Sequence, residues 1–156
     1  MTINLKTERL MLMDWQKEAI NDLRKYLSRK NSIDSMREKI EILNVRAERF
    51  GGSSNSVPVQ GGGNKPEDAL VNCIAEKIRL EENLAIAKRF VAMVERGLNY
   101  LTDDERTVLN LFYINRPTNH IERACDALHC EKSTIYRIKD SALYRFTVAM
   151  YAIIDV

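Results

Sequence analysis

Apolar residues recur every three or four positions along most of the chain, a spacing typical of amphipathic helices rather than strands. The pattern predicts one helix over residues 10–29 and a second over residues 33–50, with Asn31 and Ser32 interrupting them. The apolar positions of the first helix are Leu12, Trp15, Ala19, Leu23 and Tyr26. Those of the second alternate in steps of three and four, as in a heptad repeat, at Ile33, Met36, Ile40, Leu43, Ala47 and Phe50.

Residues 51–65 have neither a helical nor a strand period and contain five of the six glycines of the chain. A segment rich in glycine, serine and asparagine is typical of a flexible loop. Within it, we expect Val57-Pro58-Val59-Gln60 to dock in an extended conformation. The chain is therefore predicted to divide into N-terminal helices over 1–50, a loop over 51–65 and further helices after it.

A long helix is predicted over residues 66–98, with Pro66 in its first turn and Glu67 and Asp68 beside its N-terminal dipole. One apolar stripe is interrupted only by Lys77 and contains Leu70, Cys73, Leu80, Leu84, Ala87, Val91, Val94 and Leu98. A second stripe contains Ile74, Ile78, Ala85, Phe90 and Met93. Because one helix cannot bury both stripes alone, we expect it to pack antiparallel on the earlier helices or on a second copy of the chain, giving a homodimer through the heptad helices.

Residues 99–156 are predicted to form a small C-terminal helical domain. Thr102 and Glu105 have the spacing of a capping box, in which each side chain bonds the backbone of the other residue. The core face of the helix that follows is predicted to contain Val108, Leu109, Leu111, Phe112 and Ile114.

A second short helix is predicted after Thr118 or Asn119, and a tight turn over 129–131 follows it. The apolar face of this helix contains Ile121, Ala124, Cys125 and Leu128. We expect His129 to adopt a positive φ, since histidine is enriched in the left-handed region, and Cys130 to fill the small buried position after it.

A third helix is predicted from Lys132 onward, with Ile135, Ile138, Ala142, Leu143 and Phe146 facing the core. This arrangement is typical of a helix-turn-helix, whose last helix enters the DNA major groove. Arg137 is expected to bond guanine, and Ser133 or Tyr136 a base or a phosphate. The DNA-binding residues predicted from this pattern are Lys132, Ser133, Thr134, Tyr136, Arg137 and Lys139, with Arg145 farther along at the DNA backbone.

The charge distribution agrees with this interpretation. The net charge of +2 is too small to identify a nucleic-acid-binding protein. Residues 101–131, however, contain twice as many acidic as basic residues, whereas residues 132–146 contain four basic residues and one acidic residue. Positive charge is thus concentrated on the predicted reading helix, where phosphate contacts require it.

Composition excludes several other classes. No apolar run is long enough to cross a membrane, and the N-terminal residues lack a secretory signal core, so we expect a cytoplasmic protein with no membrane partner. The three cysteines are expected to be reduced thiols. No convergent acid pair or nucleophile–base arrangement is visible, so we expect neither an enzyme nor a cofactor.

Residues 101–146 resemble the promoter −35-reading region of bacterial primary sigma factors. The resemblance is carried by Leu101, Glu105, Arg106, Val108 and Leu109, and by the closing pair Ala142 and Leu143. The order of elements over residues 20–146 also resembles small phage late-operon transcriptional regulators of the autolysin-regulator type. This resemblance implies an all-α protein, with an antiparallel helical bundle or coiled coil followed by a sigma-like helix-turn-helix. It also implies binding of Lys132, Ser133, Tyr136 and Arg137 to double-stranded DNA, and contact with host RNA polymerase.

Two alternatives stay open at the level of sequence. Small terminase subunits also join a helix-turn-helix to an oligomerising helical region, so a DNA-packaging component fits the pattern. A protein-binding adaptor of RNA polymerase fits it as well, because helix-turn-helix folds also serve protein contacts. A zinc site formed by His120, Cys125, His129 and Cys130 is not expected, because no C-x-x-C pair supports it and Cys130 is needed as the small buried residue of the turn.

Overall fold

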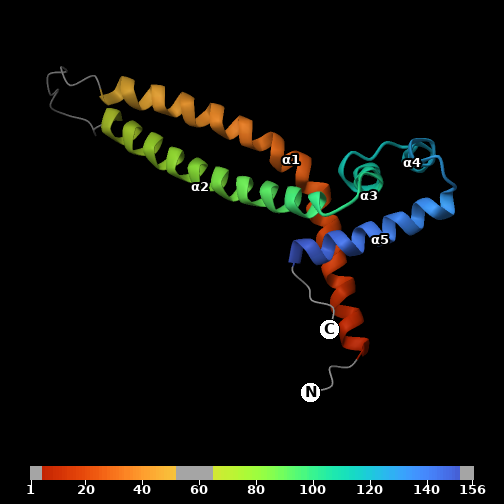
Figure 1. Cartoon of the computed structure of the whole chain (residues 1–156). Coiled ribbons are helices and arrows are strands. Elements are labelled where there is room, and N and C mark those ends of the chain that lie inside the picture. The colour runs from red at the N-terminus through yellow and green to blue at the C-terminus, as the bar shows by residue number, and fades with distance from the viewer. Residues whose placement is uncertain (1–4, 52–64, 152–156) are drawn as a thin grey trace, which may run out of the picture. The chain divides into compact units, whose positions relative to one another are not determined.

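The computed structural model describes residues 5–51 and 65–151, without the side chains of Leu5, Thr7 and Glu8. The segments predicted as the loop and as the extended Val57–Gln60 stretch lie outside the described residues, apart from their edges. The elements are α1 (Leu5–Gly51), α2 (Lys65–Asn99), α3 (Asp103–Leu109), the π-helix η1 (Asn110–Ile114), α4 (His120–Leu128) and α5 (Lys132–Tyr151) (Figure 1). The described residues contain no strand, so the predicted all-α fold class is confirmed. None of their helices is long and apolar enough to span a membrane.

The predicted interruption at Asn31 and Ser32 is wrong, because α1 continues through both residues as one helix. Asparagine and serine lower helix propensity by less than ~1 kcal/mol each, and neither imposes a break as proline does. The buried Tyr26 and Ile33 lie two turns apart on either side of the predicted interruption, so the apolar face continues across it. The chain nevertheless divides into two compact units after Arg29: residues 30–89 form one, and residues 1–29 with 90–156 form the other.

The unit of residues 30–89 is a helical hairpin. Its two helices, the end of α1 and most of α2, lie side by side and run in opposite directions (Figure 1). The predicted heptad positions face each other, with Ile33, Leu43, Cys73 and Ala87 buried. The Cys73 thiol donates a hydrogen bond of 3.3 Å to the Leu43 carbonyl oxygen. The heptad stripe of α2 therefore packs on α1 of the same chain, which is one of the two arrangements that the sequence predicted.

In the other unit, the C-terminal part of α5 packs on the start of α1 and the end of α2. The Trp15 and Tyr151 rings lie with their centroids 4.8 Å apart, and the Tyr151 hydroxyl donates to the Asp22 carboxylate. Tyr26 of α1 donates a 2.9 Å hydrogen bond to Glu95 of α2. These contacts make α5 part of one core with α1 and α2 in this unit.

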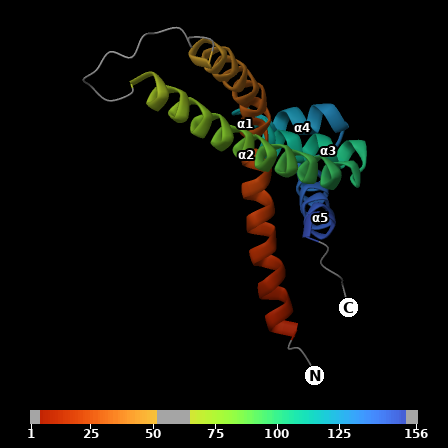
Figure 2. The same ribbon diagram turned by 90° about the vertical axis from the view of Figure 1, so that its left-hand side faces the viewer.

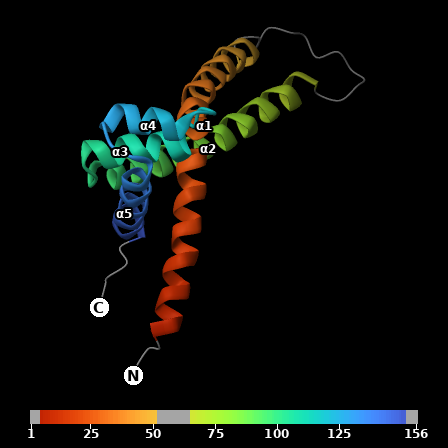
Figure 3. The ribbon, with the colours of Figure 1, turned by 90° about the vertical axis from the view of Figure 1, so that its right-hand side faces the viewer.

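The N-terminal part of α5 belongs to a second apolar cluster, formed with α3, η1 and α4 (Figures 2 and 3). Its buried members are Val108, Phe112, Ala124 and Ile135, one from each element. Phe112 lies at its centre, with edge-to-face contacts to His120 at 4.9 Å and to Tyr136 at 5.9 Å between ring centroids. This cluster fixes which side of the first turns of α5 faces the core and which side is exposed.

Glu105 joins the start of α3 to the middle of α5. The predicted capping box is confirmed: Glu105 N–H donates to the Thr102 hydroxyl, and Thr102 N–H donates to the Glu105 carboxylate at 3.0 Å. The same carboxylate oxygen accepts a 2.7 Å bond from Arg145, whose second terminal nitrogen donates to the Tyr100 carbonyl oxygen. Burial opposes the charged form of Glu105, but the bonds from Thr102 and Arg145 outweigh it, so the pKa of Glu105 lies below its ordinary value.

Gly97 lies at a close approach of α2 to the side chains of α5. A Cβ atom at this position would lie 2.8 Å from Phe146 Cε2 and 2.9 Å from Met150 Cγ. Phe146 is fully buried, so its ring has no open space to move into. The two helices can approach this closely only because residue 97 has no side chain.

We predict that Gly97→Ala lowers the free energy of unfolding by about 1 kcal/mol, because the overpacking exceeds the gain in helix propensity. Urea unfolding followed by the fluorescence of Trp15, the only tryptophan, measures this at the α1–α5 contact. Asn99→Ala changes an exposed residue of the same turn and should leave stability within about 0.5 kcal/mol of the wild type. A Gly97→Ala protein as stable as the wild type would contradict the close approach.

We predict that Glu105→Gln lowers the free energy of unfolding by about 1–3 kcal/mol at neutral pH, because Arg145 loses its charged partner. A carboxylate with a lowered folded pKa stabilises the protein above its unfolded pKa, near the ordinary value of 4.5, and this contribution is lost as pH falls through the folded pKa. The difference between wild type and variant should therefore shrink in acid, as measured by urea unfolding across pH. Asp104→Asn, at an exposed neighbour, should show no such convergence. A difference between wild type and Glu105→Gln that is independent of pH would refute the charged role.

Candidate nucleic-acid interface

The turn between α4 and α5 has the predicted backbone geometry. His129 caps α4 with φ 51° and ψ 43°, in the left-handed region, and is the only described non-glycine residue with a positive φ. The backbone N–H groups of His129 and Cys130 both donate to the Cys125 carbonyl oxygen. Cys130 is half-buried against the apolar cluster around Phe112. The turn therefore closes α4 and starts α5 within three residues.

The first turns of α5 expose a short polar surface. Ile135 is fully buried and anchors this end of the helix, while Lys132, Ser133 and Arg137 are exposed. Ser133 and Arg137 lie one helical turn apart, on the side of α5 opposite Ile135. Arg137 reaches the Thr134 hydroxyl only at 3.5 Å, so its guanidinium keeps most of its donor capacity for another partner.

Tyr136 and Lys139 are less exposed than the sequence pattern suggested. Tyr136 is half-buried because its ring packs edge-to-face on Phe112. The Lys139 ammonium lies 5.5 Å from the centroid of that ring and forms a 2.8 Å ion pair with Asp140. Partial burial disfavours the charged form of Lys139, but the bond to Asp140 and the attraction of Tyr113 outweigh it, so the pKa of Lys139 is raised. Lys139 therefore stays charged but is partly neutralised.

Arg145 lies apart from the other predicted residues. Its guanidinium is bonded to the Glu105 carboxylate and to the Tyr100 carbonyl oxygen. Sequence reasoning missed this pairing because the two charged residues are 40 positions apart, with no local pattern linking them. The ion pair between Lys139 and Asp140, by contrast, was predictable, because the two residues are adjacent in the sequence.

Two other exposed cations, Arg116 and Arg123, belong to the same unit. Arg116 precedes α4. Arg123 lies on α4, and it lines a groove together with Asp126, Thr107 and Asn110. The first helix of a helix-turn-helix crosses the DNA backbone, so a cation on α4 is a further candidate for phosphate contact.

The four residues considered for a zinc site do not gather into one. Among the described residues, no three side chains of histidine, cysteine, aspartate or glutamate form a group that could hold a metal ion. The three cysteines are free, as predicted, with Cys73 buried and Cys125 and Cys130 half-buried. His120 packs its ring against Phe112, and its Nδ1 atom is buried without a hydrogen-bond partner.

One family model matches the chain over residues 51–146, and it is described as a protein of unknown function, DUF1492. The matched segment includes α2, the apolar cluster around Phe112 and all predicted DNA-binding residues. No curated protein matches the chain, and no solved structure does. Because the match covers more than half of the sequence, the chain belongs to the DUF1492 family.

Proposed function

We propose that this chain is a sequence-selective DNA-binding transcriptional regulator rather than an enzyme. In this proposal α4, the turn at His129 and α5 form a helix-turn-helix that reads a promoter-like element in double-stranded DNA. The observation that carries it is the exposed group of Lys132, Ser133 and Arg137 at the start of a helix whose opposite side is fully buried. The resemblance to sigma factors and to phage late-operon regulators supports a phage or prophage protein that acts in the host cytoplasm.

Base reading is assigned to the two residues that face away from the core. Arg137 is long, exposed and able to donate two parallel hydrogen bonds to the O6 and N7 atoms of guanine. Ser133, one turn earlier, is short and suits a base edge or a phosphate close to the helix. Both occupy the first turns of α5, the part of a recognition helix that contacts bases.

Phosphate contacts are assigned to Lys132 and Lys139, with Tyr136 and Thr134 beside them. Lys132 is exposed at the first position of α5, where the helix dipole also favours an anion. Lys139 is held in place by Asp140 and the Tyr136 ring, so it provides a positioned charge. Arg145 is not counted among the DNA contacts, because Glu105 and Tyr100 already occupy its guanidinium.

Two acidic residues limit nonspecific attraction to DNA. Glu131, just before α5, and Asp140, on α5 itself, are both exposed and repel phosphates. The short basic surface then gains less binding free energy from phosphate contacts than a continuous lysine-rich helix would. Under this proposal a larger share of the affinity comes from base contacts, which favours sequence selectivity.

We predict that Arg137→Ala weakens binding to the selected DNA site by ~1–3 kcal/mol and relaxes one base preference. Selection of bound duplexes from a random library identifies the site, and mobility shifts on that site and on a scrambled duplex measure the loss. Lys39→Ala removes an exposed cation of the other unit and should leave both affinities unchanged. Equal losses on both duplexes for Arg137→Ala would refute its base-reading role.

We predict that Lys132→Ala weakens binding to all duplexes alike and lowers the slope of log affinity against log salt by about one, because one phosphate contact is lost. Titrations at several salt concentrations measure this slope. A loss confined to the selected site, with the salt slope unchanged, would show that Lys132 does not act on the backbone.

Two further experiments separate the regulator from the two alternatives that the sequence left open. A closed ring of many subunits in native mass spectrometry would favour a packaging component over a regulator. Absence of a mobility shift at low salt, together with co-purification of RNA polymerase, would favour an adaptor that uses the fold for protein contacts.

A further inference from the structure

The outer side of α2 in the hairpin of residues 30–89 has an exposed apolar row. Val71, Ile74 and Ile78 are 63%, 44% and 50% exposed, at steps of three and four residues. Ala75 and Ala85 are exposed on the same side, so the row is one helix face rather than scattered residues. We name this surface, Val71, Ile74, Ala75, Ile78, Ala85 and Ile86, the outer stripe.

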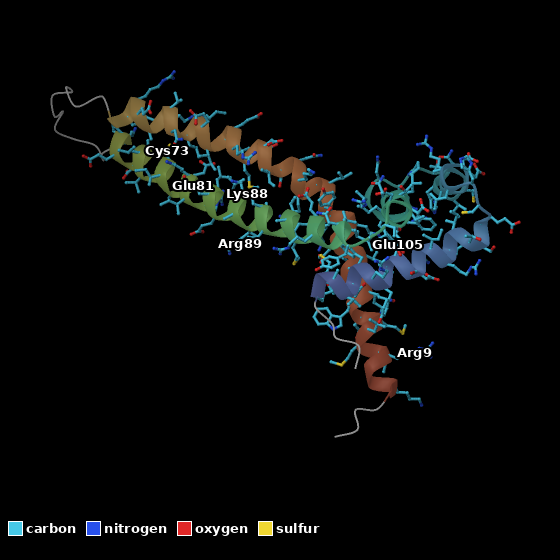
Figure 4. All side chains as sticks on the ribbon, viewed as in Figure 1. Arg9, Cys73, Glu81, Lys88, Arg89 and Glu105 are labelled. Atoms are coloured by element: carbon cyan, nitrogen blue, oxygen red, sulfur yellow. The ribbon has the colours of Figure 1, made fainter. Side chains whose placement is uncertain are left out.

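The hairpin itself cannot cover the outer stripe. The opposite side of α2 already packs on α1, where Cys73 bonds the Leu43 carbonyl oxygen. Figure 4 shows Cys73 between the two helices and Arg89 on the side of α2 away from α1. Contiguous exposed branched aliphatic residues on one helix face are typical of an interaction surface.

Charged residues at the two ends of the outer stripe have opposite signs. Asp68 lies three residues before Val71 and Arg89 lies three residues after Ile86, and both are exposed. A parallel second copy would bring like charges together at both ends. An antiparallel second copy would bring Asp68 beside Arg89 at both ends at once, and it would also align the helix dipoles favourably.

This pairing also sets a register that matches apolar residues. If Asp68 of one copy lies level with Arg89 of the other, then Val71 lies level with Ile86, since each is three residues further in. Val71 and Ile86 are among the most exposed apolar residues of the hairpin, at 63% and 61%. Ile78 then lies next to the twofold axis, where the two copies of this residue meet. Glu82, the acidic residue within the row, lies across from Ala75 and within one turn of Arg79 of the other copy.

We propose that the outer stripe of α2 binds the same surface of a second copy of this chain, in antiparallel orientation, to form a homodimer. The two hairpins together then form a four-helix arrangement in which the face left exposed on each is covered. This dimer does not depend on the proposed DNA binding, because none of its residues belongs to α5.

We predict that Ile78→Glu weakens dimerisation by about a hundredfold, because it removes apolar burial and places two carboxylates at the axis. Sedimentation of the full chain over a range of concentrations, without DNA, measures the dissociation constant. The matched control is Ile42→Glu, a change at a residue of α1 that is 54% exposed and lies off the outer stripe, and this variant should dimerise like the wild type. Both positions are exposed, so circular dichroism should show unchanged helix content.

Charge exchange tests the orientation. Asp68→Arg and Arg89→Asp should each weaken the dimer by about threefold, and the double variant should restore wild-type affinity, because opposite charges again face each other. A wild-type chain that stays monomeric, or one that forms a closed ring, would overturn the proposal. So would a dimer that Ile78→Glu leaves intact, or a double variant weaker than either single one.

Discussion

The central constraint in the unit that contains the candidate interface is that one helix, α5, is shared by two cores. Its first turns contribute Ile135 to the cluster around Phe112, and its last turns pack Phe146 against Gly97 and Tyr151 against Trp15. Because a helix is rigid over this length, fixing both ends fixes which side chains face out. The bond from Arg145 to Glu105 also holds the second half of α5 to the capping box of α3.

The same packing divides the basic residues of α5 by role. Arg145 stabilises the fold through Glu105, and Lys139 is paired with Asp140 and half-buried beside Tyr136. Lys132 and Arg137 stay exposed at the start of the helix. Fewer basic residues are therefore available for contacts with DNA phosphates than α5 contains. The proposed selectivity depends on a few well-placed hydrogen-bond donors.

In the hairpin of residues 30–89, α2 has two apolar faces, one buried and one exposed. The heptad positions of α2, such as Cys73 and Ala87, are buried against α1, while Ile74 and Ile78 stay exposed. Membership in the DUF1492 family gives no function for either surface. The proposed dimer and the proposed DNA contacts are thus assigned to different units of the chain.

The sequence alone determined the elements whose signals are local. The start of α2, the capping box at Thr102, the left-handed turn at His129 and the start of α5 each depend on a few neighbouring residues, and all were predictable. The continuity of α1 through Asn31, the pairing of Arg145 with Glu105 and the half-burial of Tyr136 were decided only by the tertiary structure. These features depend on residues distant in sequence, since burial and ion pairing are set by which helices meet in space rather than by local periodicity.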